Sequence, residues 1–217
     1  MASAPNWARE MEDILARLDT GGEKPRLLLH ACCGPCSSAV LEKLLARFEV
    51  TILYYNPNIW PAAEYHRRAG ELERFAAAFA PAVRVVEAAY DPDRYYAAVA
   101  GLEAEPERGG RCTVCYRLRM DQAARYAAAH GFDWFCTTLS ISPHKDAARI
   151  NAIGQELEAQ YGVRHLPNDF KKKNGYKRSL ELSAEYGLYR QDYCGCEFSA
   201  RRAAKEEDAP DGPSGTV

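Results

Sequence analysis

The chain has 217 residues, a formal net charge of −2 and a hydrophobic fraction of 47%. This length and composition fit one large domain with an ordinary core. The charge excludes a global basic field for nucleic acid, so a polyanionic partner needs a local basic patch. No run approaches the roughly 18 apolar residues of a membrane helix, and the first residues lack the apolar core of a signal peptide. We therefore expect a cytoplasmic protein with reduced thiols and no membrane partner.

Strand and helix patterns alternate along the chain. Residues 1–19 predict an amphipathic helix with Met11, Ile14, Leu15 and Leu18 on one face. Short apolar, β-branched or aromatic runs predict strands at residues 26–30, 50–55, 83–87, 132–137 and 163–165. Further helices are predicted from Ser37 or Ser38 to about residue 48, and at residues 61–79, 90–100, 112–130, 142–161 and 173–186.

Repeated strand–helix–strand units predict an α/β fold, in which a mostly parallel sheet carries helices on both faces. Ligands of such sheets bind at the carboxyl ends of the strands. We expect a single α/β domain over residues 26–202 and an N-terminal helical extension over residues 1–25. Residues 203–217 are charged and then rich in Pro and Gly, which predicts a disordered tail.

Eight cysteines are present, and seven of them fall into three tight groups. The groups are Cys32-Cys33-Gly34-Pro35-Cys36, Cys112-Thr113-Val114-Cys115 and Cys194-Gly195-Cys196. Clustered thiols in a reducing compartment indicate metal or redox chemistry rather than structural disulfides. The eighth, Cys136, lies inside an apolar strand and is expected to be a small buried residue.

Each group has a local geometry that suits metal binding. The first group follows a predicted strand and precedes a helix, whose positive end favours the thiolate. Cys112 and Cys115 are three residues apart and share one face of a helix. The glycine between Cys194 and Cys196 allows a sharp turn that brings both sulfurs together.

Three interpretations of these thiols remain open from the spacing alone. Two close pairs make a structural zinc site, but seven thiols exceed the four that such a site uses. The segment from Cys33 to Cys36 has the spacing of a thioredoxin-like redox pair, which leaves the other groups unexplained. An iron–sulfur cluster fits the count best, with thiolates to spare for a second metal ion.

The cysteine groups belong to longer motifs that resemble the cobalamin-independent epoxyqueuosine reductase family, QueH. The resemblance covers about residues 26–199. It is carried by LLHACCGPCS (28–37), YNPNI (55–59) followed by Glu64-Tyr65 and Arg68, RCTVCYRLR (111–119), TTLSISPHKD (137–146), NGYKRS (174–179) and YRQDYCGC (189–196). Motifs of this length, in this order, are far more specific than a single Cys-x-x-Cys.

The resemblance implies a nucleotide-hydrolase-like α/β fold, related to that of the PP-loop ATPases. It implies a [4Fe-4S] cluster with an adjacent iron ion. The substrate would be epoxyqueuosine in the anticodon loop of tRNA, deoxygenated to queuosine. Some family members carry an aspartate, described as a metal ligand, at the position of Cys36, so the resemblance leaves the role of Cys36 open.

Removing an epoxide oxygen takes two electrons and two protons, and a redox cofactor must supply the electrons. The turn after the first strand carries thiols in place of a dinucleotide fingerprint or a phosphate cradle, so we expect no ATP hydrolysis. We expect an external electron donor and an adjacent iron that acts as a Lewis acid and stores the second electron. The expected metal ligands are Cys32, Cys33, Cys112, Cys115, Cys194 and Cys196, with Cys36 as a further candidate.

Two sets of polar residues are candidates for catalysis and substrate binding. Asp192 or Tyr193, beside the last cysteine pair, is the candidate proton donor to the leaving oxygen. A helix cap or a salt-bridged structural acid explains Asp192 equally well. Asn56, Asn58 and Glu64 follow the second strand and are candidate contacts to a polar base or its cyclopentane diol, with turn chemistry and helix capping as the alternative.

Five cations lie within residues 171–178, with Tyr176 among them. We expect Lys172 and Lys173 to contact tRNA phosphates and Tyr176 to stack on a base. A solvated helix start explains the same pattern. Further candidates for phosphate contact are Arg117, Arg119, Lys145 and Arg149.

His30, at the end of the first strand, is either a hydrogen-bond donor to a ligand sulfur or a buried structural histidine. His66, His130 and His165 are expected at the surface or in loops. Two functions of other classes compete with a metalloenzyme acting on tRNA. They are a zinc-bearing RNA-binding protein and a thiol–disulfide redox protein.

Overall fold

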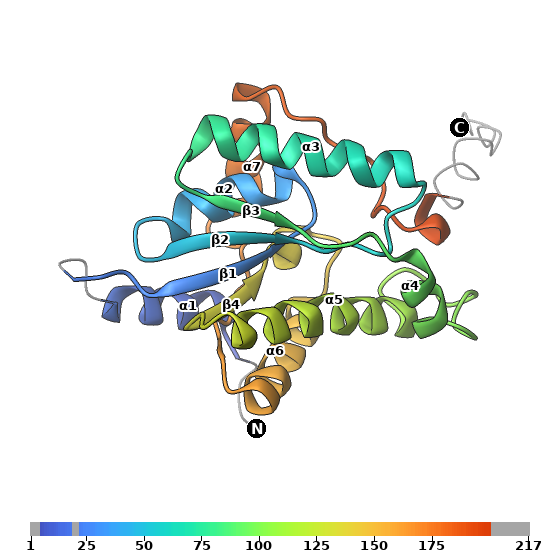
Figure 1. Ribbon diagram of the computed structural model, residues 1–217, viewed down its shortest axis with the longest axis horizontal. Coiled ribbons are helices and arrows are strands. Elements are labelled where there is room, and N and C mark those ends of the chain that lie inside the picture. The colour runs from blue at the N-terminus through green and yellow to red at the C-terminus, as the bar shows by residue number, and fades with distance from the viewer. Residues whose placement is uncertain (1–4, 19–21, 201–217) are drawn as a thin grey trace, which may run out of the picture.

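The computed structural model describes residues 5–18 and 22–200 of the chain. Five strands form one sheet in the order β3-β2-β1-β4-β5 (Figure 1). The strands are β1 (Arg26–Ala31), β2 (Glu49–Tyr54), β3 (Arg84–Glu87), β4 (Trp134–Thr137) and β5 (Arg164–His165). Every neighbouring pair is parallel, which confirms the predicted α/β class. The predicted tail at residues 203–217 lies outside the described residues.

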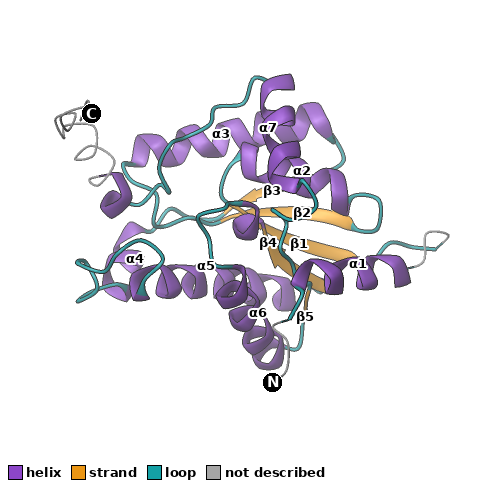
Figure 2. Cartoon of the chain, turned by 180° about the vertical axis from the view of Figure 1, so that it is seen from behind, coloured by secondary structure: helices purple, strands orange, loops and turns teal. Residues whose placement is uncertain are grey.

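Helices occupy both faces of this sheet (Figure 2). They are α1 (Trp7–Arg17), α2 (Gly34–Leu44), α3 (Ala62–Phe79), α4 (Pro92–Ala98), α5 (Gly110–Ala129), the 3₁₀ helix η1 (Thr138–Ile141), α6 (Ala147–Tyr161) and α7 (Gly175–Glu185). None of the helices in the described part of the chain has the length and apolar character needed to cross a membrane.

Successive residues of β1 divide the core into two layers, because side chains of a strand alternate between its faces. Leu27 and Leu29 belong to a cluster that includes side chains of α2 and α3. Leu28 belongs to a second cluster with side chains of α5 and α6. Met11 and Leu15 of α1 join the first cluster, so this helix packs into the core.

The sheet reverses its strand order between β1 and β4. From β1 the chain passes through α2 to β2 and β3 on one side, whereas β4 and β5 lie on the other. Connections that leave a parallel sheet in opposite directions open a crevice at the carboxyl ends of the two strands. Cys32 follows β1 and Thr138 follows β4, and Cys32 Sγ lies 3.7 Å from Thr138 Oγ1. The first cysteine group therefore sits at this crevice.

The helix after β1 begins earlier than the predicted start at Ser37 or Ser38. Cys33 is its extended N-terminal flanking residue, and Pro35 occupies its first turn, where a missing N–H costs nothing. The hydroxyls of Ser37 and Ser38 donate to the carbonyls of Cys33 and Pro35 at 2.8 and 2.9 Å, so they do not cap the helix. Cys36 therefore lies in the first turn of α2.

The helix predicted from residue 142 begins later, at Ala147. The residues after β4 form η1 instead, and the side chain of Asp146 accepts a hydrogen bond from the Arg149 backbone N–H at 3.1 Å. This acid is the N-terminal cap of α6, which explains why Ser142 and Pro143 stay outside it. Both residues line the crevice at the carboxyl end of β4.

His165, expected at the surface or in a loop, is buried between α6 and the sheet. Its ring packs 5.2 Å from that of Phe135, and a side chain at Gly154 would place a Cβ 2.3 Å from the imidazole. Within the described residues, neither ring nitrogen has a hydrogen-bond partner. Burial lowers the pKa of His165 to about 3, so the ring is neutral in the folded protein.

The substitution His165→Leu is expected to flatten the acid dependence of stability. The folded-state pKa lies below the ordinary 6.5, so the unfolded chain binds the proton more tightly. The contribution of the neutral ring to the free energy of unfolding is therefore fully present above pH ~6.5 and is lost as the pH falls. Between pH ~7.5 and ~5.5 the wild-type protein should lose about 1.4 kcal/mol of this free energy. Urea unfolding at both pH values measures the difference. An equal loss in variant and wild type would contradict the assignment.

Candidate metal centre

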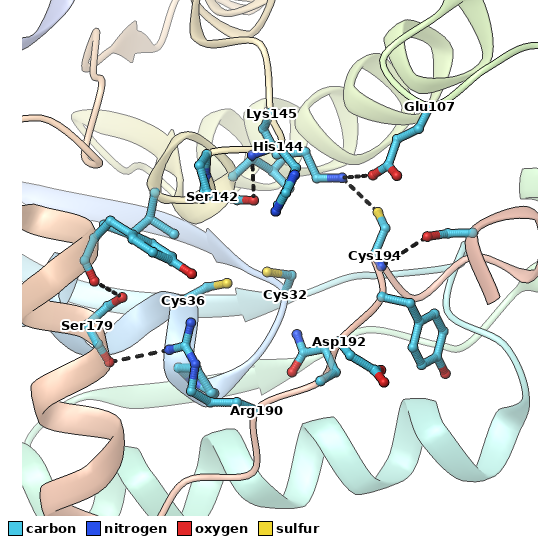
Figure 3. Close-up of a pocket in the computed structure, with 18 of the residues that line it drawn as sticks. Cys32, Cys36, Glu107, Ser142, His144, Lys145, Ser179, Arg190, Asp192 and Cys194 are labelled. Atoms are coloured by element: carbon cyan, nitrogen blue, oxygen red, sulfur yellow. Dashed lines mark hydrogen bonds and ion pairs between the residues drawn. The ribbon is translucent and has the colours of Figure 1, made fainter. Parts of the chain in front are cut away.

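A cavity of about 470 Å³ opens at the carboxyl ends of β1 and β4 (Figure 3). Cys32, Cys36 and Cys194 all face into it. Its other lining residues are Pro35, Glu107, Arg119, Leu139, Ile141, Ser142, Pro143, His144, Lys145, Tyr176, Ser179, Arg190, Gln191, Asp192, Tyr193 and Ser199. They come from elements far apart in the sequence.

The first thiol group is compact. The sulfurs of Cys32, Cys33 and Cys36 all lie within 4.8 Å of one another, at the N-terminus of α2. Hydrogen bonds from Cys33 and Cys36 hold the pKa of the Cys32 thiol well below its ordinary value. The hydrogen bond to Cys32 raises the pKa of Cys33 to about 12. A thiolate beside two further thiols, at the positive end of a helix, can bind a metal ion.

A second thiol group of the folded protein consists of Cys115, Cys194 and Cys196, and it joins α5 to the C-terminal segment. Cys115 and Cys196 share a buried cluster, and the thiols of Cys194 and Cys196 are hydrogen-bonded. That bond, and the nearby ammonium of Lys145, hold the pKa of Cys194 well below its ordinary value. The structure therefore brings cysteines of the last two sequence groups together.

Gly195 makes the approach of Cys194 and Cys196 possible. Its φ is +110°, a conformation that side chains rarely adopt. A Cβ there would lie 2.8 Å from Nη1 of the buried Arg68, which also lies 3.4 Å from the Cys194 carbonyl oxygen. The turn between the two cysteines thus has room for glycine alone.

Cys112 and Cys136 occupy different surroundings. Cys112 lies one turn before Cys115 on α5, and its sulfur accepts a hydrogen bond from the Arg108 backbone N–H at 3.3 Å. Cys136 is buried in β4, and burial raises its pKa, as expected for a core residue. All eight cysteines are free thiols.

Arg119 of α5 brings a buried positive charge to the cavity wall. It is 2% exposed, and its guanidinium donates to Asn56 Oδ1 at 2.6 Å and to Cys115 Sγ at 3.9 Å. Burial alone would lower the pKa of Arg119, but negative charge on Cys115 and Cys32 outweighs burial and raises it. Arg119 thus faces the cavity and not the outer surface, and the phosphate contact that the sequence suggested remains a prediction.

Lys145 places a second buried cation beside Cys194. Its Nζ lies 2.7 Å from Cys194 Sγ and 3.8 Å from the Glu107 carboxylate (Figure 3). Burial would lower the pKa of Lys145, but the charges of Cys194 and Tyr116 outweigh it and raise the pKa. Lys145 therefore faces sulfur inside the cavity, although the sequence suggested a phosphate partner.

Charge balance shows that the site suits a metal–thiolate group. Arg68, Arg119 and Lys145 are buried here, whereas Glu64 is the one fully buried carboxylate among the described residues. An uncompensated buried charge costs several kcal/mol. Thiolates that bind a metal are deprotonated and supply the missing negative charge. Sulfur ligands suit zinc, copper(I) and iron–sulfur clusters, so the residues present fit a thiolate-ligated metal centre.

The candidate proton donors lie where the sequence placed them, beside Cys194. Asp192 and Tyr193 both line the cavity. Asp192 is exposed and, among the described residues, has no hydrogen bond or ion pair; it is neither a helix cap nor a salt-bridged acid here. The Tyr193 hydroxyl donates to the Trp60 carbonyl at 3.1 Å. Their catalytic role remains a prediction.

The candidate substrate contacts after β2 point into the protein. Asn56, Asn58 and Glu64 are buried, and none of them lines the cavity. Asn56 donates to the Ala31 carbonyl at 2.9 Å, and Glu64 accepts from Arg68 Nε at 2.6 Å. These contacts are structural, but they are neither the turn chemistry nor the helix capping that the sequence analysis gave as the alternative. The contact of these residues with substrate remains a prediction.

The basic segment near α7 divides into two parts. Tyr176 lines the cavity, whereas Lys172 and Lys173 are exposed outside it. Lys173 Nζ lies 3.9 Å from Glu12 of α1, and Arg178 pairs with acids of α2 and α7. Arg117 and Arg149 likewise pair with Glu156 and Asp146. The proposed phosphate contact of the lysines remains a prediction.

Several cavity residues were missed by the sequence interpretation, among them Arg190, Gln191, Glu107 and His144. Arg190 lies with its guanidinium 5.8 Å from the ring centroid of Tyr176. Gln191 donates to Cys33 Sγ at 3.2 Å, and Glu107 lies beside Lys145. Arg190 and Gln191 precede Asp192 in the motif at residues 189–196, and this position could have identified them from the sequence. Glu107 lies in a polar loop that offered no such signal.

His30 is a buried structural histidine. Its Nδ1 lies 2.8 Å from Thr137 Oγ1, and its Nε2 lies 3.1 Å from the Tyr55 carbonyl oxygen. Burial, with the charge of Arg119, lowers its pKa to about 3. A neutral ring that donates to the carbonyl and accepts from the threonine satisfies both nitrogens, so no donor remains for sulfur.

Fold and site together define an α/β protein whose sheet carries, at its switch point, a thiol-lined cavity that could hold a metal. The family model for epoxyqueuosine reductase QueH matches residues 27–202. The epoxyqueuosine reductase QueH of Streptococcus pyogenes serotype M1 is 42% identical over 200 residues, which cover 90% of this chain and 78% of that protein. The protein of the same name from Staphylococcus epidermidis is 40% identical over 203 residues, 91% of this chain and 85% of the relative.

A more distant relative, the epoxyqueuosine reductase QueH of Thermotoga maritima, is 35% identical over 174 residues, 80% of this chain and 89% of the relative. The chain therefore belongs to the epoxyqueuosine reductase QueH family, a family of oxidoreductases. This confirms the resemblance that the motifs indicated.

The substitution Gly195→Ala is expected to destabilise the turn between Cys194 and Cys196. The strained φ and the clash with Arg68 together are expected to lower the free energy of unfolding by roughly 1–3 kcal/mol. The metal content of the protein is expected to decrease as well. Thermal unfolding and metal analysis measure both effects. Gly187→Ala is the matched control, because Gly187 also has a positive φ, of +57°, but open space around it. Equal effects in the two variants would contradict the close-approach argument.

Proposed function

We propose that this protein deoxygenates epoxyqueuosine to queuosine in tRNA. The observation that carries the proposal is one cavity lined by three cysteines, Cys32, Cys36 and Cys194, and by two buried cations, in a chain of the family named for this reduction. A bare structural zinc site would not need a cavity of about 470 Å³ beside its ligands. That space is of the size that small-molecule sites use.

The metal centre in this proposal is a [4Fe-4S] cluster with an adjacent iron ion. It would be held from the turn between β1 and α2, from α5 and from the C-terminal segment. The ligands would be drawn from Cys32, Cys33, Cys36, Cys112, Cys115, Cys194 and Cys196. When bound, this group supplies electrons at a potential that no side chain reaches.

The cavity walls provide groups that suit a modified base. Tyr176 and Arg190 form one wall, and both a ring and a guanidinium plane can stack on a base. His144 and Lys145 lie on another wall (Figure 3). A base of the anticodon loop would have to leave its stack to enter. The walls would then exclude water and orient the epoxide toward the thiol groups.

The reduction breaks both C–O bonds of the epoxide, forms a C=C bond and releases the oxygen as water, with two electrons and two protons consumed. Asp192 would deliver a proton to the leaving oxygen, because it lines the cavity with no other partner among the described residues. Burial raises the pKa of Tyr193, which keeps its hydroxyl protonated at neutral pH. Tyr193 would orient the substrate or relay the second proton.

The electrons would come from an external donor that reloads the metal centre after each turnover. Free thiols at all eight cysteine positions fit the reducing environment of the cytoplasm, where tRNA is also found.

The substitution Asp192→Asn is expected to lower kcat by roughly 100-fold or more, because an amide cannot donate a proton to the leaving oxygen. Metal content and visible spectrum should stay unchanged. The assay incubates the metal-loaded protein anaerobically with dithionite and tRNA bearing epoxyqueuosine, and counts queuosine by mass spectrometry. Asp93→Asn, at an exposed position of α4, is the control.

Two outcomes of this assay would contradict the account at different levels. Full turnover by the Asp192→Asn variant would remove Asp192 from the mechanism. Failure of the fully loaded wild-type protein to form any queuosine would contradict the proposed function itself.

The substitution Arg119→Met is expected to lower the reduction potential of the metal centre, because a positive charge beside the ligands favours the reduced, more negative state. A charged hydrogen bond is worth about 1.5–3 kcal/mol, equivalent to roughly 60–130 mV for one electron. Arg119→Lys keeps the charge and should retain most of the potential. A redox titration followed by electron paramagnetic resonance measures all three proteins. Identical potentials would contradict the electrostatic role.

A further inference from the structure

Trp60 is a large aromatic residue held at the surface of the protein. It is 42% exposed, and in the described part of the chain only Leu180 is a comparably exposed large hydrophobic residue. By contrast, Trp134 is buried in the core, where its ring packs against Phe48, and Trp7 is half-buried on α1. Exposure of one indole is ordinary in itself, so the place and the surroundings of Trp60 carry the inference, and its ring offers a large flat face on which a base can stack.

The backbone of Trp60 is tied on both sides to the segment that carries the second thiol group. Its N–H donates to the Gly195 carbonyl at 2.8 Å, and its carbonyl accepts from the Tyr193 hydroxyl at 3.1 Å. These partners flank Cys194, which lines the cavity together with Tyr193. The backbone that carries the exposed indole is therefore anchored beside the cavity.

The residues that follow Trp60 add cationic and aromatic groups. The guanidinium of the exposed Arg67 lies 3.4 Å over the ring of the half-buried Tyr189. Arg68 lies 5.2 Å from the ring centroid of Tyr193 but is buried and paired with Glu64, so Arg67 is the cation of this surface. Exposed aromatic faces with nearby guanidinium groups are the surface that single-stranded nucleic acid uses, because every base can stack on them. A protein partner would instead favour a larger contiguous apolar patch.

Nucleotides on either side of a base that leaves its stack lose a stacking neighbour. We propose that Trp60 is the stacking platform for a nucleotide adjacent to the modified one, outside the cavity. The proposal rests on the proposed function for the identity of the RNA. It assigns Trp60 to binding of the loop, and the chemistry remains with the residues of the cavity.

Tryptophan fluorescence tests this contact directly. An anticodon stem-loop RNA added to the metal-loaded protein should quench the fluorescence of wild type, because a stacked base quenches an indole. The Trp60→Phe variant keeps Trp7 and Trp134, and its fluorescence should not respond. A duplex of the stem alone should not quench either protein. A response of Trp60→Phe as large as that of wild type would overturn the proposal.

Affinity measured by anisotropy of an end-labelled stem-loop gives an independent readout. Trp60→Ala should weaken binding by roughly ten-fold or more, and Trp60→Phe should restore most of the loss, since phenylalanine keeps an aromatic face. Leu180→Ala is the matched control and should bind as wild type. Unchanged affinity in Trp60→Ala, or an equal loss in Leu180→Ala, would overturn the proposal.

Turnover separates this inference from the proposed function. In Trp60→Ala, KM for modified tRNA should rise while metal content and the rate with free epoxyqueuosine nucleoside, if any, stay as in wild type. An equal loss with the free nucleoside would place Trp60 in the cavity and overturn the platform. If wild type forms no queuosine but the binding pattern holds, the proposed function fails and the platform stands.

Discussion

Positive charge buried beside sulfur is the constraint on which the site depends. Arg119 and Lys145 line the cavity, and each has a cysteine sulfur as its nearest potentially anionic partner. Arg68 forms an ion pair with Glu64. Neutral thiols would leave Arg119 without an ionised partner and Lys145 with only the half-buried Glu107 carboxylate, 3.8 Å away, in a medium of low dielectric constant. Metal-bound thiolates remove this cost, because the metal takes the place of the thiol protons. The cations would in turn make a bound metal centre less negative and easier to reduce.

The sheet topology and the C-terminal segment together bring the thiol groups to the crevice. The reversal of strand order between β1 and β4 opens the crevice in which the first thiol group sits. The chain then returns after α7 and places residues 189–196 across the crevice, held by Arg68, Gly195 and the backbone of Trp60. The same contacts that fix Cys194 therefore also fix the backbone that carries the exposed indole. In the proposed account, metal binding and RNA binding therefore depend on one ordered segment.

Features set by short sequence spacing were predictable, and features set by long-range packing were not. The parallel sheet and the grouping of Cys32, Cys33 and Cys36 followed from strand periodicity and adjacent positions. The meeting of Cys115 with Cys196 needed a resemblance to a family, because no local pattern joins α5 to the C-terminus. Polar residues after a strand look alike in sequence whether they face a ligand or a buried cation, and the buried contacts of Asn56 with Arg119 show the second case. From the sequence, Arg119 resembles an ordinary surface cation, and only the packing of α5 against the sheet shows that it is buried.

The most direct test of this account is the iron, zinc and sulfide content of the anaerobically purified protein, together with its visible spectrum. The account predicts about four sulfides and four to five irons per chain, with a broad brown absorbance. Stoichiometric zinc without sulfide, persisting after anaerobic reconstitution with iron and sulfide, would contradict it. The thiols and buried cations would then belong to a zinc site, and the reductive chemistry proposed for this cavity would have no source of electrons.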